Sequence, residues 1–372
     1  MPHIVLITGG AGFIGAHLAN ELLERGDQVR VLDALHPQVH GAGERPDYLP
    51  DDVELVVGDV RDPDAVRKAL HGVDRVAHLA ARVGVGQSMY EISEYTSVNS
   101  GGTGVLLEAL LEHPVEQLVV ASSMSVYGEG LYVDDEGRAT PAIPRRRADL
   151  ADGRWDPVGP SGQALTPVPT PEAKPPTLSS VYALGKYDQE RLCLMFGEAY
   201  NVPTVALRFF NAYGPYQALS NPYTGVLAIF ASRLLNGRPP LVFEDGDQQR
   251  DFVSVHDVAR ACALALSAGA DVEGQVLNVG SGQSMTITQI VTELASILDK
   301  DDVLPEVTGK YRVGDIRHCF ADISLAEQVL GYQPQVPLDK GLTELAGWLE
   351  GQVATDDVDA ATAELTSRGL AV

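Results

Sequence analysis

Cysteine is scarce in this chain of 372 residues, which contains three cysteines. Cys193, Cys262 and Cys319 show no CxxC spacing and no evident pairing. The scarcity excludes a disulfide framework and a zinc ribbon, so we expect no bound metal. Free thiols in this number are typical of a protein that works in the reducing cytoplasm.

Basic residues are also few. The chain has 27 lysines and arginines against 51 aspartates and glutamates, a formal net charge of −24. Such a charge gives no general attraction for nucleic acid or for an anionic membrane. We therefore expect no nucleic-acid partner, and any phosphate-bearing ligand has to be held by local hydrogen-bond donors.

Long apolar runs are missing as well. No stretch has the length of a membrane-spanning helix, and residues 3–8 have the character of a buried strand and not of a signal peptide. We expect a protein that is neither exported nor embedded in a membrane. A hydrophobic content of 45% is that of an ordinary globular protein, and 372 residues exceed one ordinary core.

Short apolar runs alternate with amphipathic stretches through residues 1–210, which is typical of βαβ units. The predicted strands are His3–Thr8, Gln28–Leu32, Leu55–Val57, Arg75–Leu79, Leu118–Ala121 and Val205–Arg208. The predicted helices between them are Ile14–Arg25, Pro63–Leu70, Gly104–Leu111 and Val181–Tyr200. This order predicts an α/β fold with a doubly wound parallel sheet, the Rossmann architecture.

Breaks in this pattern predict the domain order. Residues 1–210 form the Rossmann domain, with a proline-rich insert at about 129–179 that is either a functional lid or disordered. Residues 211–352 form a smaller α/β lobe with some segments that return to the first. Its predicted elements are helices Gly225–Leu235, Val255–Leu266 and Thr286–Leu298, and strands Leu241–Phe243 and Val276–Val279. Residues 353–372 are expected to be an acidic tail, as a short helix or a frayed end.

A glycine-rich turn follows the first predicted strand and opens the first predicted helix. It has the sequence TGGAGFIG over residues 8–15, and its candidate ligand contacts are Gly9, Gly12, Phe13, Ile14 and Gly15. Such a turn lets the backbone approach a pyrophosphate, and the helix amino terminus offers free N–H groups and a favourable dipole. Three glycines in a tight turn can also be purely structural, so the context decides.

Residues at the ends of the next strands supply that context. Asp33 ends the second predicted strand, where its carboxylate can accept hydrogen bonds from an adenosine ribose and would repel a 2′-phosphate. We therefore predict NAD and not NADP as the cofactor. Ligands lie at the carboxyl edge of open α/β sheets, so the residues after the third and fourth strands are further candidates. These are Asp59, Val60, Leu79, Ala80 and Ala81.

A phenol and an ammonium lie four residues apart at Tyr182 and Lys186, on one face of a predicted helix. A tyrosine acts as a base near neutral pH only if positive charge stabilises its phenolate, and Lys186 and an oxidised nicotinamide would both supply that charge. A hydroxyl-rich stretch, residues 121–128, lies at the end of the fifth predicted strand, and a serine there can hydrogen-bond a substrate alcohol. Tyr/Lys pairs are also common on helix surfaces, so this one carries weight only beside the glycine turn.

The chain resembles the extended short-chain dehydrogenases that modify nucleotide sugars, the family of UDP-galactose 4-epimerase. The matching motifs span nearly the whole chain. They are TGGAGFIG at 8–15, Asp33, HLAA at 78–81, Asn99, SSMSVYG at 122–128, YxxxK at 182–186, RFFN at 208–211, RDFV at 250–253, NVGSG at 278–282 and RVGD at 312–315. Each motif by itself is weak evidence for the family, and together the motifs make a chance match very unlikely.

The resemblance implies a role for each matching residue. Ser123 becomes the catalytic hydroxyl, Tyr182 the base, and Lys186 the residue that holds the nicotinamide ribose. Asn99 joins the cofactor-binding set. The implied substrate-binding residues are Ser123, Ser125, Tyr182, Asn211, Arg250 and Arg312, of which the last three match positions that hold the nucleotide diphosphate.

The family shares an opening step, in which the tyrosine takes the proton of the sugar C4 hydroxyl while hydride passes to NAD. The dehydratases then use an Asp-Glu pair, and the UDP-glucuronate decarboxylases a glutamate, where this chain has Met124 and Ser125. A thioether and a neutral alcohol cannot perform that acid/base work. The resemblance therefore implies a nucleotide-sugar 4-epimerase, with a 4-reductase or dehydrogenase and a UDP-glucuronate decarboxylase as the alternatives.

The resemblance leaves the substrate open between dTDP- and UDP-hexoses. Gly314–Cys319 and the long insert resemble epimerases of the dTDP-L-rhamnose 4-epimerase kind more than compact UDP-galactose 4-epimerases. Family members pair through a four-helix bundle, which implies a homodimer through Gly102–Glu112 and Val181–Tyr200. The apolar residues of these helices, Leu106, Leu110, Leu192 and Met195, can equally belong to the subunit's own core.

Overall fold

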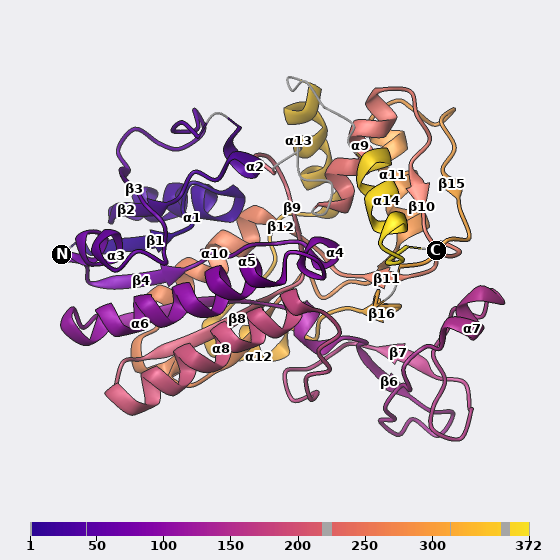
Figure 1. Ribbon diagram of the computed structural model, residues 1–372, viewed down its shortest axis with the longest axis horizontal. Helices are drawn as coiled ribbons and strands as arrows, with labels where there is room; N and C mark the ends of the chain where they lie inside the picture. Colours follow the sequence, from indigo (N-terminus) through magenta and orange to yellow (C-terminus); the bar gives the residue numbers. More distant parts are fainter. Residues whose placement is uncertain (1, 42, 218–224, 313, 351–357, 372) are drawn as a thin grey trace.

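A seven-stranded parallel sheet is the centre of the computed structural model, which describes residues 2–41, 43–217, 225–312, 314–350 and 358–371 (Figure 1). The strand order is β13-β8-β5-β4-β1-β2-β3. The strands are β1 (Ile4–Thr8), β2 (Gln28–Asp33), β3 (Glu54–Val57), β4 (Arg75–His78), β5 (Gln117–Ser123), β8 (Thr204–Phe209) and β13 (Val276–Val279). Every neighbouring pair is parallel, so all carboxyl ends lie at one edge. The predicted doubly wound Rossmann fold is confirmed.

Helices cover both faces of this sheet. One face carries α1 (Phe13–Glu24), α10 (Val255–Ser267) and α12 (Ser324–Leu330), whose buried side chains share a hydrophobic core with the strands. The other face carries α3 (Pro63–Leu70), α6 (Gly102–Glu112) and α8 (Val181–Tyr200) over a second core. Strands buried on both faces explain the continuous apolar runs of the sequence.

Two segments beyond the predicted boundary near residue 210 return to the main sheet, and the sequence did not indicate which segments these would be. Val276–Val279 was expected in the smaller lobe, and it forms β13 at the edge of the main sheet, parallel to β8. Val255–Leu266 was expected there as well, and it forms most of α10, which packs against α1. The pattern of a short apolar run after a helix is the same in both lobes, so only long-range pairing distinguishes them.

The second lobe has its own helical core. It is formed by α9 (Val226–Leu235), α11 (Ile287–Ile297) and α13 (Leu338–Glu350). Short strands attach to it: β9 (Asn211–Tyr213) with β12 (Phe252–Ser254), β10 (Leu241–Val242) with β15 (Glu306–Val307), and β11 (Gln249–Arg250) between β14 (Met285–Thr286) and β16 (His318–Cys319). Figure 1 shows this lobe beside the carboxyl ends of the main strands.

The proline-rich insert is a folded segment and not a disordered loop. It contains the antiparallel pair β6 (Leu131–Val133) and β7 (Thr166–Val168) and the short helix α7 (Arg147–Ala151). Arg317 of the second lobe is 1% exposed and pairs with Asp156 of the insert at 2.8 Å and with Glu244 at 3.1 Å. Arg145 of the insert pairs with the same Glu244 at 2.7 Å. These ion pairs, in which Arg317, Glu244 and Arg145 are buried and Asp156 is exposed, attach the insert to the second lobe.

The predicted acidic tail contains a helix, which was one of the two expectations for this segment. This helix is α14 (Val358–Ser367), and part of the predicted tail lies outside the described residues. Beyond it, Ala371 is buried and forms an isolated bridge with Arg312, while the guanidinium of Arg368 lies over the ring of Tyr90 at 4.2 Å. Within the described ranges, no helix is both long and apolar enough to cross a bilayer.

Candidate active site

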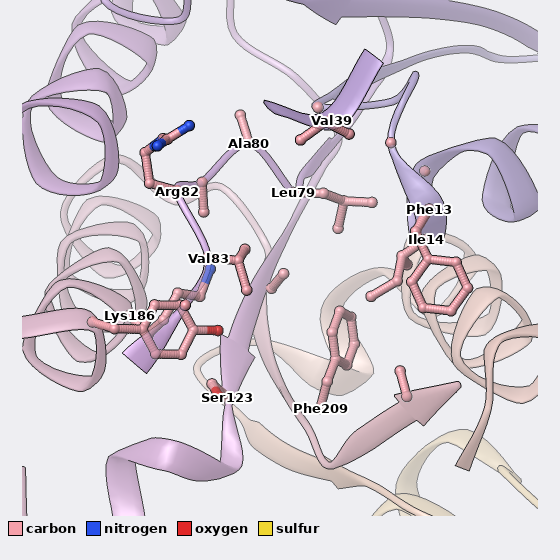
Figure 2. Close-up of a pocket in the computed structure, with 18 of the residues that line it drawn as sticks. Phe13, Ile14, Val39, Leu79, Ala80, Arg82, Val83, Ser123, Lys186 and Phe209 are labelled. Atoms are coloured by element: carbon pink, nitrogen blue, oxygen red, sulfur yellow. The ribbon is translucent and has the colours of Figure 1, made fainter. Parts of the chain in front are cut away.

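A cavity of about 480 Å³ opens at the carboxyl edge of the sheet. Its walls come from the residues that follow β1 to β5 and β8, and from Leu227 and Phe252 of the second lobe. Figure 2 shows Lys186 and Ser123 at one end and Phe13 and Ile14 at another, with Leu79 and Ala80 between. This is the edge at which open α/β sheets bind ligands.

The glycine turn forms one wall of the cavity. Gly9 has φ +70°, and a Cβ on it would lie 2.8 Å from the Cα of Ala80. A Cβ on Gly15 would lie 2.5 Å from the Cα of Gly10, so the helix could not pack on the turn. Gly12 precedes α1 without any side-chain cap on the helix amino terminus. The turn therefore leaves a backbone cradle that fits a diphosphate.

Asp33 links this turn to the end of β2. Its two oxygens accept the backbone N–H groups of Ala11 at 3.1 Å and Leu35 at 2.8 Å. Burial raises the pKa of the Asp33 carboxyl, and those two hydrogen bonds and nearby His40 oppose the rise. A carboxylate has about four acceptor positions, so Asp33 keeps capacity for the hydroxyl groups of a ribose.

The other predicted cofactor contacts divide into two groups. The cavity is lined by Asp59, Val60, Leu79, Ala80 and Ala81, as the sequence predicted. Asn99 is fully buried outside the described lining, where its side chain accepts the N–H of Arg82 at 2.7 Å and donates to the carbonyl of Arg82 at 3.1 Å. Its two amide atoms are used on that backbone, so Asn99 shapes the wall instead of facing the ligand.

The residues predicted to be catalytic meet at one end of the cavity. Ser180 caps α8 by accepting the N–H of Ala183, which places Tyr182 in the first turn of the helix. Ser123 ends β5, and its side chain lines the same cavity as Tyr182. Burial raises the pKa of Tyr182, and the hydroxyl of Ser123 opposes that rise. Both residues and Lys186 line the cavity.

Lys186 has a partner that the sequence analysis missed. Its ammonium donates to the Oε1 atom of Gln189 at 2.7 Å, and burial lowers the pKa of Lys186 to about 8. The amide nitrogen of Gln189 donates in turn to the carbonyl of Ala80 and to Thr103, both within 3.2 Å. Ala80 can only accept and Lys186 can only donate, which fixes the orientation of the amide. The spacing of three residues after Lys186 was the available signal.

The substrate end of the cavity is largely apolar. Ser125 and Asn211 line it, as predicted, and the Oδ1 atom of Asn211 has no hydrogen-bond partner among the described residues. Around them lie the side chains of Val83, Val85, Met124, Phe209, Phe210 and Phe252. A hexose ring fits a site of this kind, with few polar groups to orient it.

Arg250 and Arg312 lie outside the described lining, although both were predicted to hold the diphosphate. The guanidinium of Arg250 donates to the carbonyl groups of Gln249, Ile316 and Arg317, because β11 pairs with β16 in this region. The guanidinium of Arg312 lies over the ring of Phe243 at 4.2 Å. In this arrangement both arginines brace the second lobe.

Comparison with protein families gives a match over most of the chain. The model of the NAD dependent epimerase/dehydratase family matches residues 5–148 and 158–280. The chain belongs to this family. Its cofactor is NAD, and the glycine cradle, the capacity of Asp33 and the buried Lys186 fit that dinucleotide.

Curated and solved relatives agree with the family. A protein of Burkholderia thailandensis named dTDP-L-rhamnose 4-epimerase is 37% identical over 93% of this chain and 94% of its own length. The UDP-glucose 4-epimerase structure from Thermus thermophilus, a complex with NAD, has a TM-score of 0.74 and 31% identity over 94% of this chain and 100% of that one. A Thermotoga maritima UDP-glucose 4-epimerase structure with UDP-glucose has a TM-score of 0.75 and 28% identity, over 93% and 98% of the two chains.

Proposed function

We propose that this chain is an NAD-dependent 4-epimerase of nucleotide sugars, with dTDP-L-rhamnose or a close relative as the substrate. The observation that carries the proposal is that Ser123, Tyr182 and Lys186 line the same cavity as the glycine turn. The curated protein that is 37% identical is named dTDP-L-rhamnose 4-epimerase, which supports both the reaction and the sugar.

Each catalytic side chain has a defined task in this proposal. Tyr182 takes the proton from the C4 hydroxyl and later returns a proton to the oxygen at C4. Ser123 hydrogen-bonds that oxygen in both states, and Lys186 supplies positive charge that stabilises the phenolate. NAD held by the glycine turn, Asp33 and Lys186 would supply the acceptor and donor of the C4 hydride. The reaction needs no acid or base besides these three side chains.

The alternatives find less support. Met124 and Ser125 line the cavity where dehydration or decarboxylation would need carboxylates. A UDP-glucuronate substrate would need a cation for its carboxylate. Besides Lys186, the cationic residues in the described lining are Arg61, paired with Asp59 at 2.7 Å, and Arg82. Arg82 is near Glu91 at 3.3 Å. A neutral or 6-deoxy hexose matches the apolar walls best.

Product analysis tests the reaction. Incubation of the purified protein with dTDP- and UDP-hexoses is expected to invert C4, as measured by NMR, without accumulation of NADH in its absorbance band. A dTDP-6-deoxyhexose should have the highest kcat/KM of the panel. Steady formation of NADH would indicate a dehydrogenase, and loss of the C6 carboxylate as carbon dioxide would indicate a decarboxylase.

Replacement of Gln189 by leucine tests the charge on Lys186. Without its acceptor the ammonium is less stable, and the pKa of Lys186 should fall from about 8 by roughly a further 1–2 units, because a hydrogen bond to a charged group is worth about 1.5–3 kcal/mol. Since the positive charge is present only below that pKa, the loss of kcat should be about tenfold at pH 8 and small at pH 6. A pH profile of kcat measures this.

A second buried glutamine provides the matched control. Gln117 is 1% exposed at the opposite end of β5, and the replacement of Gln117 by leucine should leave the pH profile unchanged. An equal loss of kcat at every pH in the Gln189 variant would contradict the proposed effect on Lys186.

We also propose a homodimer through α6 and α8, which lie side by side in Figure 1. Leu106 and Leu110 belong to the subunit's own core, and Leu192 packs against it. Met195 is 50% exposed, and Leu111, Leu184 and Tyr200 on the same two helices are also exposed. These exposed side chains support the pairing, and a monomer mass at all concentrations in light scattering would contradict it.

The proposed location is the cytoplasm. All three cysteines are free and buried, which suits a reducing environment. Fractionation of cells that produce the protein, followed by detection with an antibody, tests the location.

A further inference from the structure

Two loops meet over the carboxyl end of β1, where the dinucleotide has to lie. In the strand order, β1 separates β4 from β2. The loop after β2 contains the short helix α2 (Pro37–His40), and the segment after β4 contains α4 (Val85–Ser88). Because their strands are not neighbours, any contact between these loops passes across the end of β1. The glycine turn that follows β1 lies at the same place.

Side chains join the two loops directly. The amides of Gln38 and Gln87 form a reciprocal pair, with N···O distances of 3.1 and 3.3 Å. The guanidinium of Arg82 donates to the Oε1 atom of Gln38 at 2.8 Å and approaches the ring nitrogens of His36 at 3.1 and 3.2 Å. His36, Gln38 and Arg82 line the cavity together with the glycine turn, and Gln87 supports Gln38 from behind that wall.

The segment after β4 is held firmly in this position. Asn99 bonds both backbone groups of Arg82, as described above. Gln87 is 7% exposed and donates to Glu91 at 2.9 Å, while its Oε1 atom accepts the hydroxyl of Tyr95 at 3.2 Å. Arg82 also lies within 3.3 Å of Glu91. In the contact between the two loops, the segment after β4 is therefore the rigid partner. The other partner is the short loop after β2.

We propose that Gln38, Gln87 and Arg82 form a clasp that closes over the diphosphate of the bound dinucleotide and retains it through many turnovers. The glycine turn lies on one side of that diphosphate and the clasp on the other, so NAD enters and leaves only when the glutamine pair separates. Arg82 adds a positive charge above a dianionic group in a protein of net charge −24. The inference rests on NAD as the cofactor and not on the identity of the sugar.

The release rate of NAD tests the clasp without any sugar substrate. Holoenzyme is mixed with excess 1,N6-etheno-NAD, and the exchange of bound NAD is followed by chromatography of the protein fraction. Gln38→Ala and Gln87→Ala should each release NAD about tenfold faster than the wild type, since each removes the amide pair. The double variant should be little faster than Gln38→Ala, because Gln38→Ala already removes both the amide pair and the bond from Arg82.

Gln28→Ala is the matched control, since Gln28 is exposed at the other end of β2 and should leave release unchanged. Wild-type release rates in both variants would overturn the clasp. A loss of kcat per bound NAD with unchanged release would also overturn it, because the glutamines would then serve the reaction. If no sugar is turned over by any variant, the exchange rates still decide the matter.

Discussion

Replacement of Tyr182 by phenylalanine is expected to lower kcat by about 10³-fold or more, because a positioned acid/base group contributes about 10²–10⁴-fold. Tyr182 and Ser123 both line the cavity, and removal of the phenol oxygen leaves no base at that position. Binding of NAD should stay within a fewfold of wild type, since the glycine cradle and Asp33 are untouched. The measurements are initial rates of C4 inversion and the NAD content of the purified variant.

Tyr200 lies on the same helix and provides the control for this variant. It is 56% exposed, so Tyr200→Phe should retain wild-type rates. Activity near the wild-type level in Tyr182→Phe would remove the proposed base, whereas loss of both activity and NAD would show that the substitution damaged the fold around α8.

Replacement of Arg317 by methionine should have the largest effect on stability. The guanidinium is enclosed by Asp156, Glu244 and Asp245, at distances of 2.6–3.1 Å. Glu244 is buried and keeps Arg145 as a partner, while Asp156 and Asp245 reach solvent, so the loss of Arg317 should cost about 1–3 kcal/mol. We expect a lower urea midpoint for unfolding, measured by circular dichroism, and weaker attachment of the insert.

Arg146 provides the comparison, because its ion pair with Asp149 lies on the surface of the insert. Arg146→Met should keep the wild-type midpoint, since exposed ion pairs contribute little. Arg317→Met would contradict the structural argument if its midpoint equalled that of Arg146→Met, and faster proteolysis of the insert would support the argument.

Local patterns in the sequence predicted most of the sheet and the glycine turn. The strand ends, the turn at residues 8–15 and the Tyr182/Lys186 pair depend on periodicity and on contacts a few residues apart, which the sequence displays directly. The pairing of β13 with β8 could not be predicted in this way, because it joins segments about seventy residues apart that have no distinctive pattern.

The orientation of polar side chains was the least predictable part of the site. Arg250 and Asn99 matched family positions, yet Arg250 bonds the carbonyls of residues 316 and 317 and Asn99 bonds the backbone of Arg82. The pair of Gln38 and Gln87 joins residues 49 positions apart. Such contacts depend on how two loops approach each other in space, and no spacing rule describes that approach.

The three buried cysteines have a practical consequence. Burial raises the pKa of each thiol to about 12, so none forms the reactive thiolate at neutral pH. The thiols of the folded enzyme should therefore not react with maleimide dyes. A cysteine placed at exposed Ser161 in the insert would then be the single site of labelling. A fluorophore at that position could report, in real time, whether the insert moves when a nucleotide sugar binds.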